Sequence, residues 1–194
     1  MRMAALIAAA ALAALLYAAP WRGAGVEPFT LHMLRHIGLV ALVAPLLAIA
    51  FGPGRIGVSP LAATVAEFAV VWGWHLPRLH EAAAVSPFVL AIEQFSYLAV
   101  GLALWASVAR AIALAGAGAM ALTFMHMTLL GALLILAPRP LYTAVCFGPD
   151  PLSDQQLGGM LMLAVASPVY LAAGLWKLRQ TLDGPASENA EETQ

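Results

Sequence analysis

The sequence of 194 residues has a single cysteine and few charged side chains. Only 10% of its residues are Asp, Glu, Lys or Arg, whereas a soluble domain usually carries about 25%. The lone Cys146 excludes an intramolecular disulfide and any site built on a cysteine pair. Walker A, G-x-S-x-G and HExxH patterns are absent, and no basic cluster favours nucleic acid. We therefore expect neither an enzyme nor a nucleic-acid-binding protein.

Hydrophobic residues are abundant, at 62% of the chain, and the mean hydropathy is +0.87. Apolar runs of roughly 17 to 25 residues, the length that a bilayer core demands, recur along the sequence. They occupy residues 3–19, 31–51, 61–76, 88–108, 111–137 and 156–178. This pattern predicts an all-α polytopic bundle of about six transmembrane helices. We expect one domain at 1–180 and a polar, disordered tail at 181–194.

The first apolar run has two interpretations. Arg2 precedes it and Pro20 follows it, as in a signal peptide, but the small residues suited to cleavage, Gly23 and Gly25, lie far from the run. We therefore expect a retained span. Basic residues near the span ends then set the orientation. With a cytoplasmic N-terminus the inner side holds Arg2, Arg55, Arg110, Lys177 and Arg179, and the outer side holds Arg22, Arg35, Arg78 and Arg139. This distribution favours both termini in the cytoplasm.

All five histidines fall in one half of the predicted bundle. His32 and His36 lie four residues apart at the start of a span, so both side chains share one helical face. His75 closes the third span, His80 lies in the loop just after it, and His126 lies toward the outer end of the fifth span. Imidazole suits copper, zinc and iron, and thioether sulfur selects Cu(I) among them. This half of the bundle is therefore the candidate metal site.

The expected ligand set combines imidazole with thioether and points to copper, as Cu(I). Its members are His32, His36, His75, His126, Met33 and Met127. Glu93 is costly in lipid unless it is paired, so we expect it to orient a histidine, with Arg35 or a protonated histidine as its partner. His80 is expected in a loop, supporting the site. Two alternatives stay open: the histidines form structural hydrogen bonds, or they ligate haem b.

Several stretches in order give a family resemblance. They are "LHMLRHIGLVALVAPLLAIA", "WGWHLPRLHEAAAVSPFVLAIEQFSYLAVGLALW", "HMTLLGALLILAPRPLY" and "DPLSDQQLGGMLML". From about residue 30 to 180 the chain resembles the multi-spanning CtaG family of cytochrome c oxidase assembly factors. The resemblance implies a bacterial inner-membrane protein that handles copper for a haem-copper oxidase. It also implies membrane lipid, oxidase subunits and a copper donor protein as partners.

The resemblance also implies which residues form the site. The family's histidine pair falls on His32 and His36, its Trp-His-x-Pro motif on residues 74–77, and its Asp-Gln-Gln motif on residues 154–156. In this interpretation Asp154 caps the final helix from the outer loop.

The chain also departs from the family. Glu93 is followed by Gln94 where the family usually has histidine, and His80 stands where the family usually has tyrosine. The family typically has seven spans, and this chain offers six. His80 is thus a candidate substitute ligand. The alternatives to copper delivery are a haem b-binding membrane protein and a metal-free scaffold for oxidase subunits.

Overall fold

The computed structural model describes residues 1–52 and 57–191, with side chains up to Thr181. The described residues form helices and loops, without a strand, so the all-α prediction is confirmed. The elements are α1 (Arg2–Ala18), α2 (Pro28–Ile37), the π-helical η1 (Gly38–Val43), α3 (Ala44–Phe51), α4 (Pro60–Trp74), α5 (Pro77–Val85), α6 (Pro87–Arg110), α7 (Ala113–Leu136), the 3-10 turn η2 (Ala144–Cys146), α8 (Pro151–Leu161), the π-helical η3 (Met162–Ala166) and α9 (Ser167–Glu191).

Four helical stretches in the described part of the chain are long and apolar enough to cross a membrane. They are Pro28–Phe51, Pro87–Arg110, Ala113–Leu136 and Pro151–Thr181. The shorter apolar helices α1 and α4 account for the other two predicted segments. The prediction of about six spans therefore matches six apolar helical stretches. Four of these are long enough to cross a membrane, and two are shorter. The short helix α5 was not predicted: the sequence was interpreted as a loop there.

Two predictions fall partly outside what the structure describes. Arg55, counted in the orientation argument, is not among the described residues. Of the predicted tail at 181–194, only the backbone as far as Glu191 is described beyond Thr181, within α9. The disorder of that segment stays a prediction.

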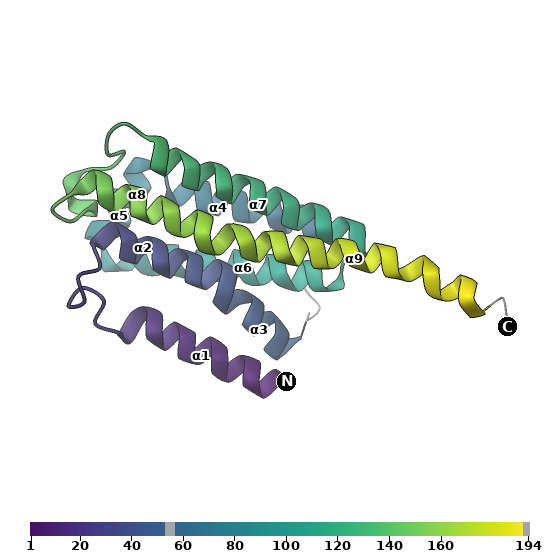
Figure 1. Cartoon of the computed structure of the whole chain (residues 1–194). Coiled ribbons are helices and arrows are strands. Elements are labelled where there is room, and N and C mark those ends of the chain that lie inside the picture. Colours follow the sequence, from purple (N-terminus) through teal and green to yellow (C-terminus); the bar gives the residue numbers. More distant parts are fainter. Residues whose placement is uncertain (53–56, 192–194) are drawn as a thin grey trace.

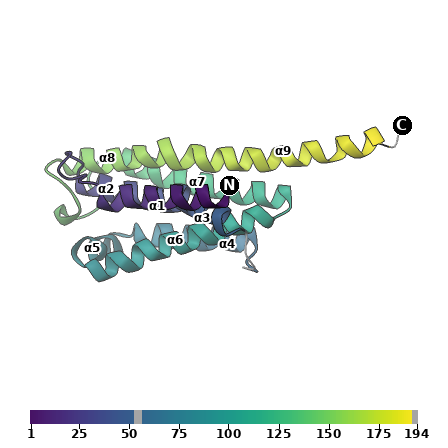
Figure 2. The ribbon, with the colours of Figure 1, turned by 90° about the horizontal axis from the view of Figure 1, so that it is seen from below.

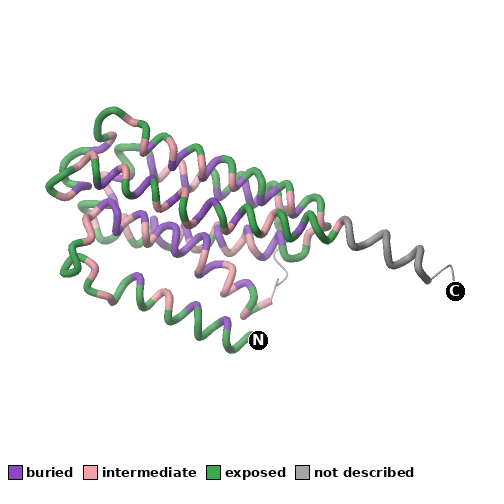
Figure 3. The backbone as a smooth tube through the Cα atoms, viewed as in Figure 1, coloured by how far each residue is buried: buried purple, intermediate pink, exposed green. Residues whose placement is uncertain are grey.

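The helices pack along a common direction (Figure 1). The N-terminus and the far end of α9 lie toward one end of the bundle, whereas α5, the start of α2 and the start of α8 lie at the other (Figure 1). We call the latter the α5 end. In the turned view α8 and α9 form one side and α4, α5 and α6 the other, with α2 and α7 between them (Figure 2). Buried residues follow the inward faces of the helices (Figure 3).

Proline opens most of these helices. A proline at the first helical position has a preset φ and lacks only an N–H that would have no partner there. Five helices begin in this way, at Pro28, Pro60, Pro77, Pro87 and Pro151. Pro77 therefore starts α5 directly after α4 ends, and this reversal brings His80 back toward the bundle.

Small residues let two helix pairs approach closely. A Cβ at Gly158 of α8 would lie 2.6 Å from Phe29 Cε1 and 2.8 Å from Met33 Cγ, so α2 packs directly on α8. A Cβ at Gly101 of α6 would lie 3.1 Å from the backbone of Val40 in η1. The widened π turn leaves backbone groups without their α-helical partners, and the indole of Trp105 donates to Val40 O at 2.9 Å. These contacts fix α2 and η1, which carry the candidate site.

Candidate metal site

The first turn of α2 is held by a carboxylate from α8. Asp154, 2% exposed, accepts hydrogen bonds from Phe29 N at 3.1 Å, from Thr30 N at 2.8 Å and from Thr30 Oγ1 at 2.7 Å. The expectation that Asp154 caps its own helix is therefore wrong. Asp150 takes that role by accepting from Ser153 N. Asp154 instead satisfies N–H groups at the start of α2, one turn before His32.

The two glutamines after Asp154 complete this junction. Gln155 accepts a hydrogen bond from Leu141 N at 2.7 Å and donates to Leu134 O at 3.0 Å. Gln156 donates to Ile135 O at 3.2 Å. The Asp-Gln-Gln motif thus ties α8 to the end of α7, the following loop and α2. In this structure the motif is a structural junction at the α5 end.

Four histidines meet beside Glu93 at this end of the bundle. His32, His36, His75 and His80, which we call the histidine cluster, come from α2, the C-cap of α4 and α5. His32 Nε2 lies 3.4 Å from Glu93 Oε1 of α6. One ligand atom each from His32, His80 and Glu93 lies within 4.8 Å of the others. This spacing lets three side chains converge on one ion.

The other two histidines form the adjoining layer. The ring centroid of His36 is 5.2 Å from that of His75 and 4.2 Å from that of Tyr97, on which it stacks. His75 Nδ1 lies 2.6 Å from Val71 O, so a proton there fixes the tautomer and leaves Nε2 as an acceptor. Tyr142 donates to His75 O at 3.1 Å.

The histidine cluster has unused nitrogen atoms. Buried polar atoms normally have hydrogen-bond partners. Several buried imidazole nitrogens lack one among the described residues: His32 Nε2, His36 Nδ1, His36 Nε2, His75 Nε2 and His80 Nδ1. Burial lowers the pKa of His80, so its ring is neutral, the form that binds metals. A cluster of imidazoles with open nitrogens beside a carboxylate fits a copper or zinc ion.

Glu93 is supported by its own helix. Its carboxylate accepts from Gln94 Nε2 at 3.0 Å and from Tyr97 Oη at 3.4 Å. Tyr17 of α1 donates to Gln94 Oε1 at 2.6 Å, so Gln94 links α1 to the acid. Arg35 is not the partner of Glu93. Its Nε donates to Leu16 O at 3.1 Å, and its guanidinium lies 5.1 Å from the centre of the Tyr17 ring.

The predicted sulfur ligands lie elsewhere. Met33 is fully buried against Gly158 of α8, whereas His32 points toward α6. Met127 is fully buried in the apolar core. Neither joins the convergent atoms of His32, His80 and Glu93. The donor set that the structure brings together is thus nitrogen and oxygen.

The fifth histidine belongs to a second buried polar group. His126 Nε2 lies 3.8 Å from Glu67 Oε2. The fully buried Glu67 also accepts from Tyr170 Oη at 2.8 Å and from Thr123 Oγ1 at 3.2 Å. These contacts stabilise a carboxylate that the sequence left without a role. His126 therefore pairs with Glu67 rather than with Glu93.

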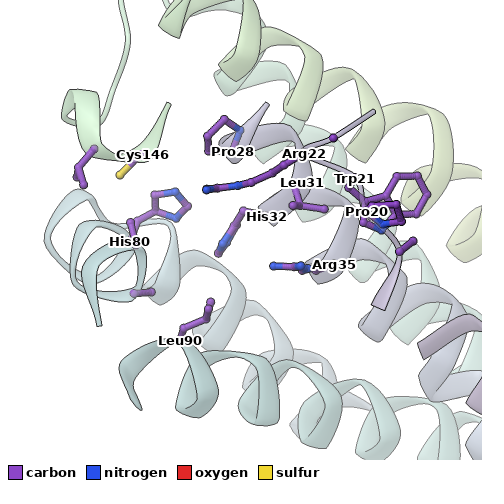
Figure 4. A pocket seen from close by; sticks show the side chains of 15 residues that line it. Pro20, Trp21, Arg22, Pro28, Leu31, His32, Arg35, His80, Leu90 and Cys146 are labelled. Carbon is purple, nitrogen blue, oxygen red and sulfur yellow. The ribbon is translucent and has the colours of Figure 1, made fainter. Parts of the chain in front are cut away.

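A pocket of about 350 Å³ opens beside the histidine cluster. His32 and His80 line it together with Trp21, Arg22 and Arg35 (Figure 4). The other lining residues are Ala19, Pro20, Gly23, Pro28, Leu31, Ala83, Ala84, Leu90, Val145 and Cys146. Burial raises the pKa of Cys146 to about 11, which keeps this thiol neutral.

Sequence reasoning missed two contributors: Tyr97 as the ring beneath His36, and Asp154 as the anchor of α2. His80 was expected beside the site and as a candidate substitute ligand, but in a loop rather than on a helix. The four-residue spacing of Glu93 and Tyr97 was a usable signal, since it places both on one helical face. The contacts of Asp154 depend on distant segments and left no local signal.

Comparison with known proteins identifies the family. The model of the cytochrome c oxidase caa3 assembly factor family matches residues 51–183, which is more than half of the chain. The matched range includes His75, His80 and Glu93 and begins after His32. No curated protein and no solved structure matches the chain. The chain therefore belongs to the cytochrome c oxidase caa3 assembly factor family, as its motifs led us to expect.

Proposed function

We propose that this membrane protein binds one copper ion at the histidine cluster and supplies it to a haem-copper oxidase during assembly. The family gives the role in oxidase assembly, and oxidase subunits as partners. That this role involves no catalysis is part of our proposal. The copper, its donor protein and its delivery are our proposal. We place the protein in the bacterial inner membrane with both termini in the cytoplasm, so that the α5 end faces outward.

One observation carries the copper proposal: His32, His80 and Glu93 offer donor atoms within 4.8 Å of one another, and the buried Nδ1 of His80 has no hydrogen-bond partner among the described residues. Copper has the highest affinity among the divalent first-row metals for such ligands. His36 and His75 supply further nitrogens next to this set.

Electrostatics favours the monovalent ion. Burying a net charge is costly in a low-dielectric interior. Cu(I) with the Glu93 carboxylate forms a neutral pair, whereas Cu(II) leaves one uncompensated positive charge. Glu93 is fully buried, so water does not offset the extra charge that Cu(II) would bring to the site.

Haem is the weaker candidate. The rings of His32 and His80 lie in edge contact with their centroids 4.5 Å apart, and His36 stacks on Tyr97 at 4.2 Å. A porphyrin between two axial histidines needs these rings to be separated by a macrocycle. The packing therefore favours an ion.

A competition titration tests the proposal. Detergent-purified protein competes with a chromogenic chelator for Cu(I), and we expect about one tightly bound ion in the wild type. His32→Ala combined with His80→Ala should lower the affinity at least 100-fold, because both convergent nitrogens are lost. The matched control His126→Ala removes an imidazole outside the cluster and should change the affinity less than threefold.

Circular dichroism and gel filtration show whether each variant stays folded. An unchanged affinity in the folded double variant would refute the site. Full function of that variant in oxidase assembly would favour the metal-free scaffold.

A further inference from the structure

The pocket beside the histidine cluster has an unusual charge balance. Arg22 and Arg35 line it, and no Asp or Glu of the described residues does so. Arg22 makes no hydrogen bond or ion pair within the described part of the chain. Figure 4 shows its side chain reaching across the pocket toward His80. Two guanidinium groups thus face one space without a compensating acid on its walls.

Such a pocket selects against free cations. Like charges that share a partly desolvated space repel, and the field in a cleft lined by one sign of charge concentrates ions of the opposite sign. A bare copper ion that approaches His32 through this pocket is repelled by the two guanidinium groups. The ligand that suits the pocket is an anion.

The pocket walls also carry metal-binding chemistry. His32 lines it, and so does His80, whose Nδ1 has no hydrogen-bond partner among the described residues. The neutral thiol of Cys146 lines it as well. A site that binds only phosphate does not require imidazole or thiol groups. Thiolates are the ligands that soft Cu(I) prefers, and two of them give a linear complex of charge −1.

We propose that copper enters this pocket as an anionic bis-thiolate Cu(I) complex, which Arg22 and Arg35 attract and from which His32 and His80 take the metal. This inference rests on the proposed function and names the form of its copper substrate. The exchange is redox-neutral. Two Cu–N bonds form and two Cu–S bonds break, copper stays Cu(I), and each thiolate leaves with its electron pair and its negative charge.

The test compares two copper donors. Purified protein in uncharged detergent is mixed with Cu(I) held by excess glutathione, which is anionic, or with cationic Cu(I) acetonitrile complex. Rapid desalting and elemental analysis give the transfer rate. Arg22→Glu should slow transfer from the anionic donor at least tenfold at low salt and leave transfer from the cationic donor equal or faster. At 0.5 M salt the difference should shrink, because screening weakens exposed charges.

Two variants serve as controls. Arg22→Lys keeps the charge and should keep the wild-type rates within threefold. Arg139→Glu makes the same change of net charge at an exposed loop position outside the pocket, and it should leave both rates unchanged.

Each of the following results would overturn the inference. Equal slowing by Arg22→Glu and Arg139→Glu, or equal slowing with both donors, would show that the pocket does not select by charge. Transfer blocked by added phosphatidylglycerol and restored by Arg22→Glu would assign the pocket to a lipid headgroup. If the wild type binds Cu(I) with normal affinity but shows no preference between donors, the inference is refuted and the proposed function stands. If the wild type takes Cu(I) from neither donor, both the inference and the proposed function are refuted.

Discussion

The carboxylate of Asp154 accepts a hydrogen bond from the backbone N–H of Thr30 at 2.8 Å, across 124 residues of sequence. Asp154 also accepts from Phe29 N and Gly148 N through its second oxygen. One buried side chain of α8 therefore fixes both the start of α2 and the loop that covers the histidine cluster.

Asp154→Asn should lower both stability and copper affinity. The amide keeps one acceptor oxygen but turns the other into an NH₂ group that faces backbone donors. We expect a loss of about 1–3 kcal/mol in the free energy of unfolding, the cost of leaving buried groups unpaired. Thermal unfolding in detergent measures it. Asp150→Asn is the control, because asparagine caps a helix as well as aspartate does. Equal effects of the two substitutions would contradict the anchoring role.

Gly158→Ala should separate α2 from α8. A methyl group there would lie 2.6 Å from the ring of Phe29, closer than real contacts allow, and overpacking of this kind costs about 1–3 kcal/mol. Gly118→Ala, on a helix position with no atom within 4 Å of the new methyl group, should be neutral or slightly stabilising. The midpoints of thermal unfolding compare the two. A neutral Gly158→Ala would mean that α2 does not rest on α8 as described.

Glu93→Gln should weaken Cu(I) binding about 10- to 100-fold, in line with the loss of supporting groups at other metal sites. The amide keeps the size of the side chain and removes the negative charge that offsets the ion. Glu81→Gln is the control, since Glu81 accepts from Thr143 N at 3.0 Å and is not among the convergent donors. If both variants bind Cu(I) as the wild type does, Glu93 has no part in the site.

Tyr170→Phe should affect stability without affecting copper. It removes the hydrogen bond to Glu67 at 2.8 Å and leaves that buried carboxylate with fewer donors. We expect a loss of about 1–3 kcal/mol in unfolding free energy and an unchanged Cu(I) affinity. A marked fall in affinity would show that the Glu67–His126 group and the histidine cluster act together.

The sequence predicted the helical bundle, and the four-residue spacing of His32 and His36 predicted that they share a face, because both depend on local periodicity. The prediction that Asp154 caps its own helix was wrong, and the cause lies in the local sequence. "DPLSDQQ" offers two acids at the start of one helix, and only the packed bundle shows that the second one serves α2.

His80 and Met33 show two other limits. His80 was expected in a loop because Pro77 was interpreted as a helix end, yet proline also opens helices, and here it opens α5. Met33 follows His32 directly, and adjacent helical residues point about 100° apart. That geometry already argued against a shared ligand set, and the contact with Gly158 is in line with it.

X-ray absorption at the copper edge of the copper-loaded protein identifies the atoms that bind the ion. Because His32, His80 and Glu93 converge while Met33 and Met127 pack elsewhere, we predict nitrogen and oxygen neighbours only, with the outer-shell scattering of at least two imidazole rings. Sulfur in the first coordination sphere of the resting site, or copper that is lost on desalting, would contradict this prediction.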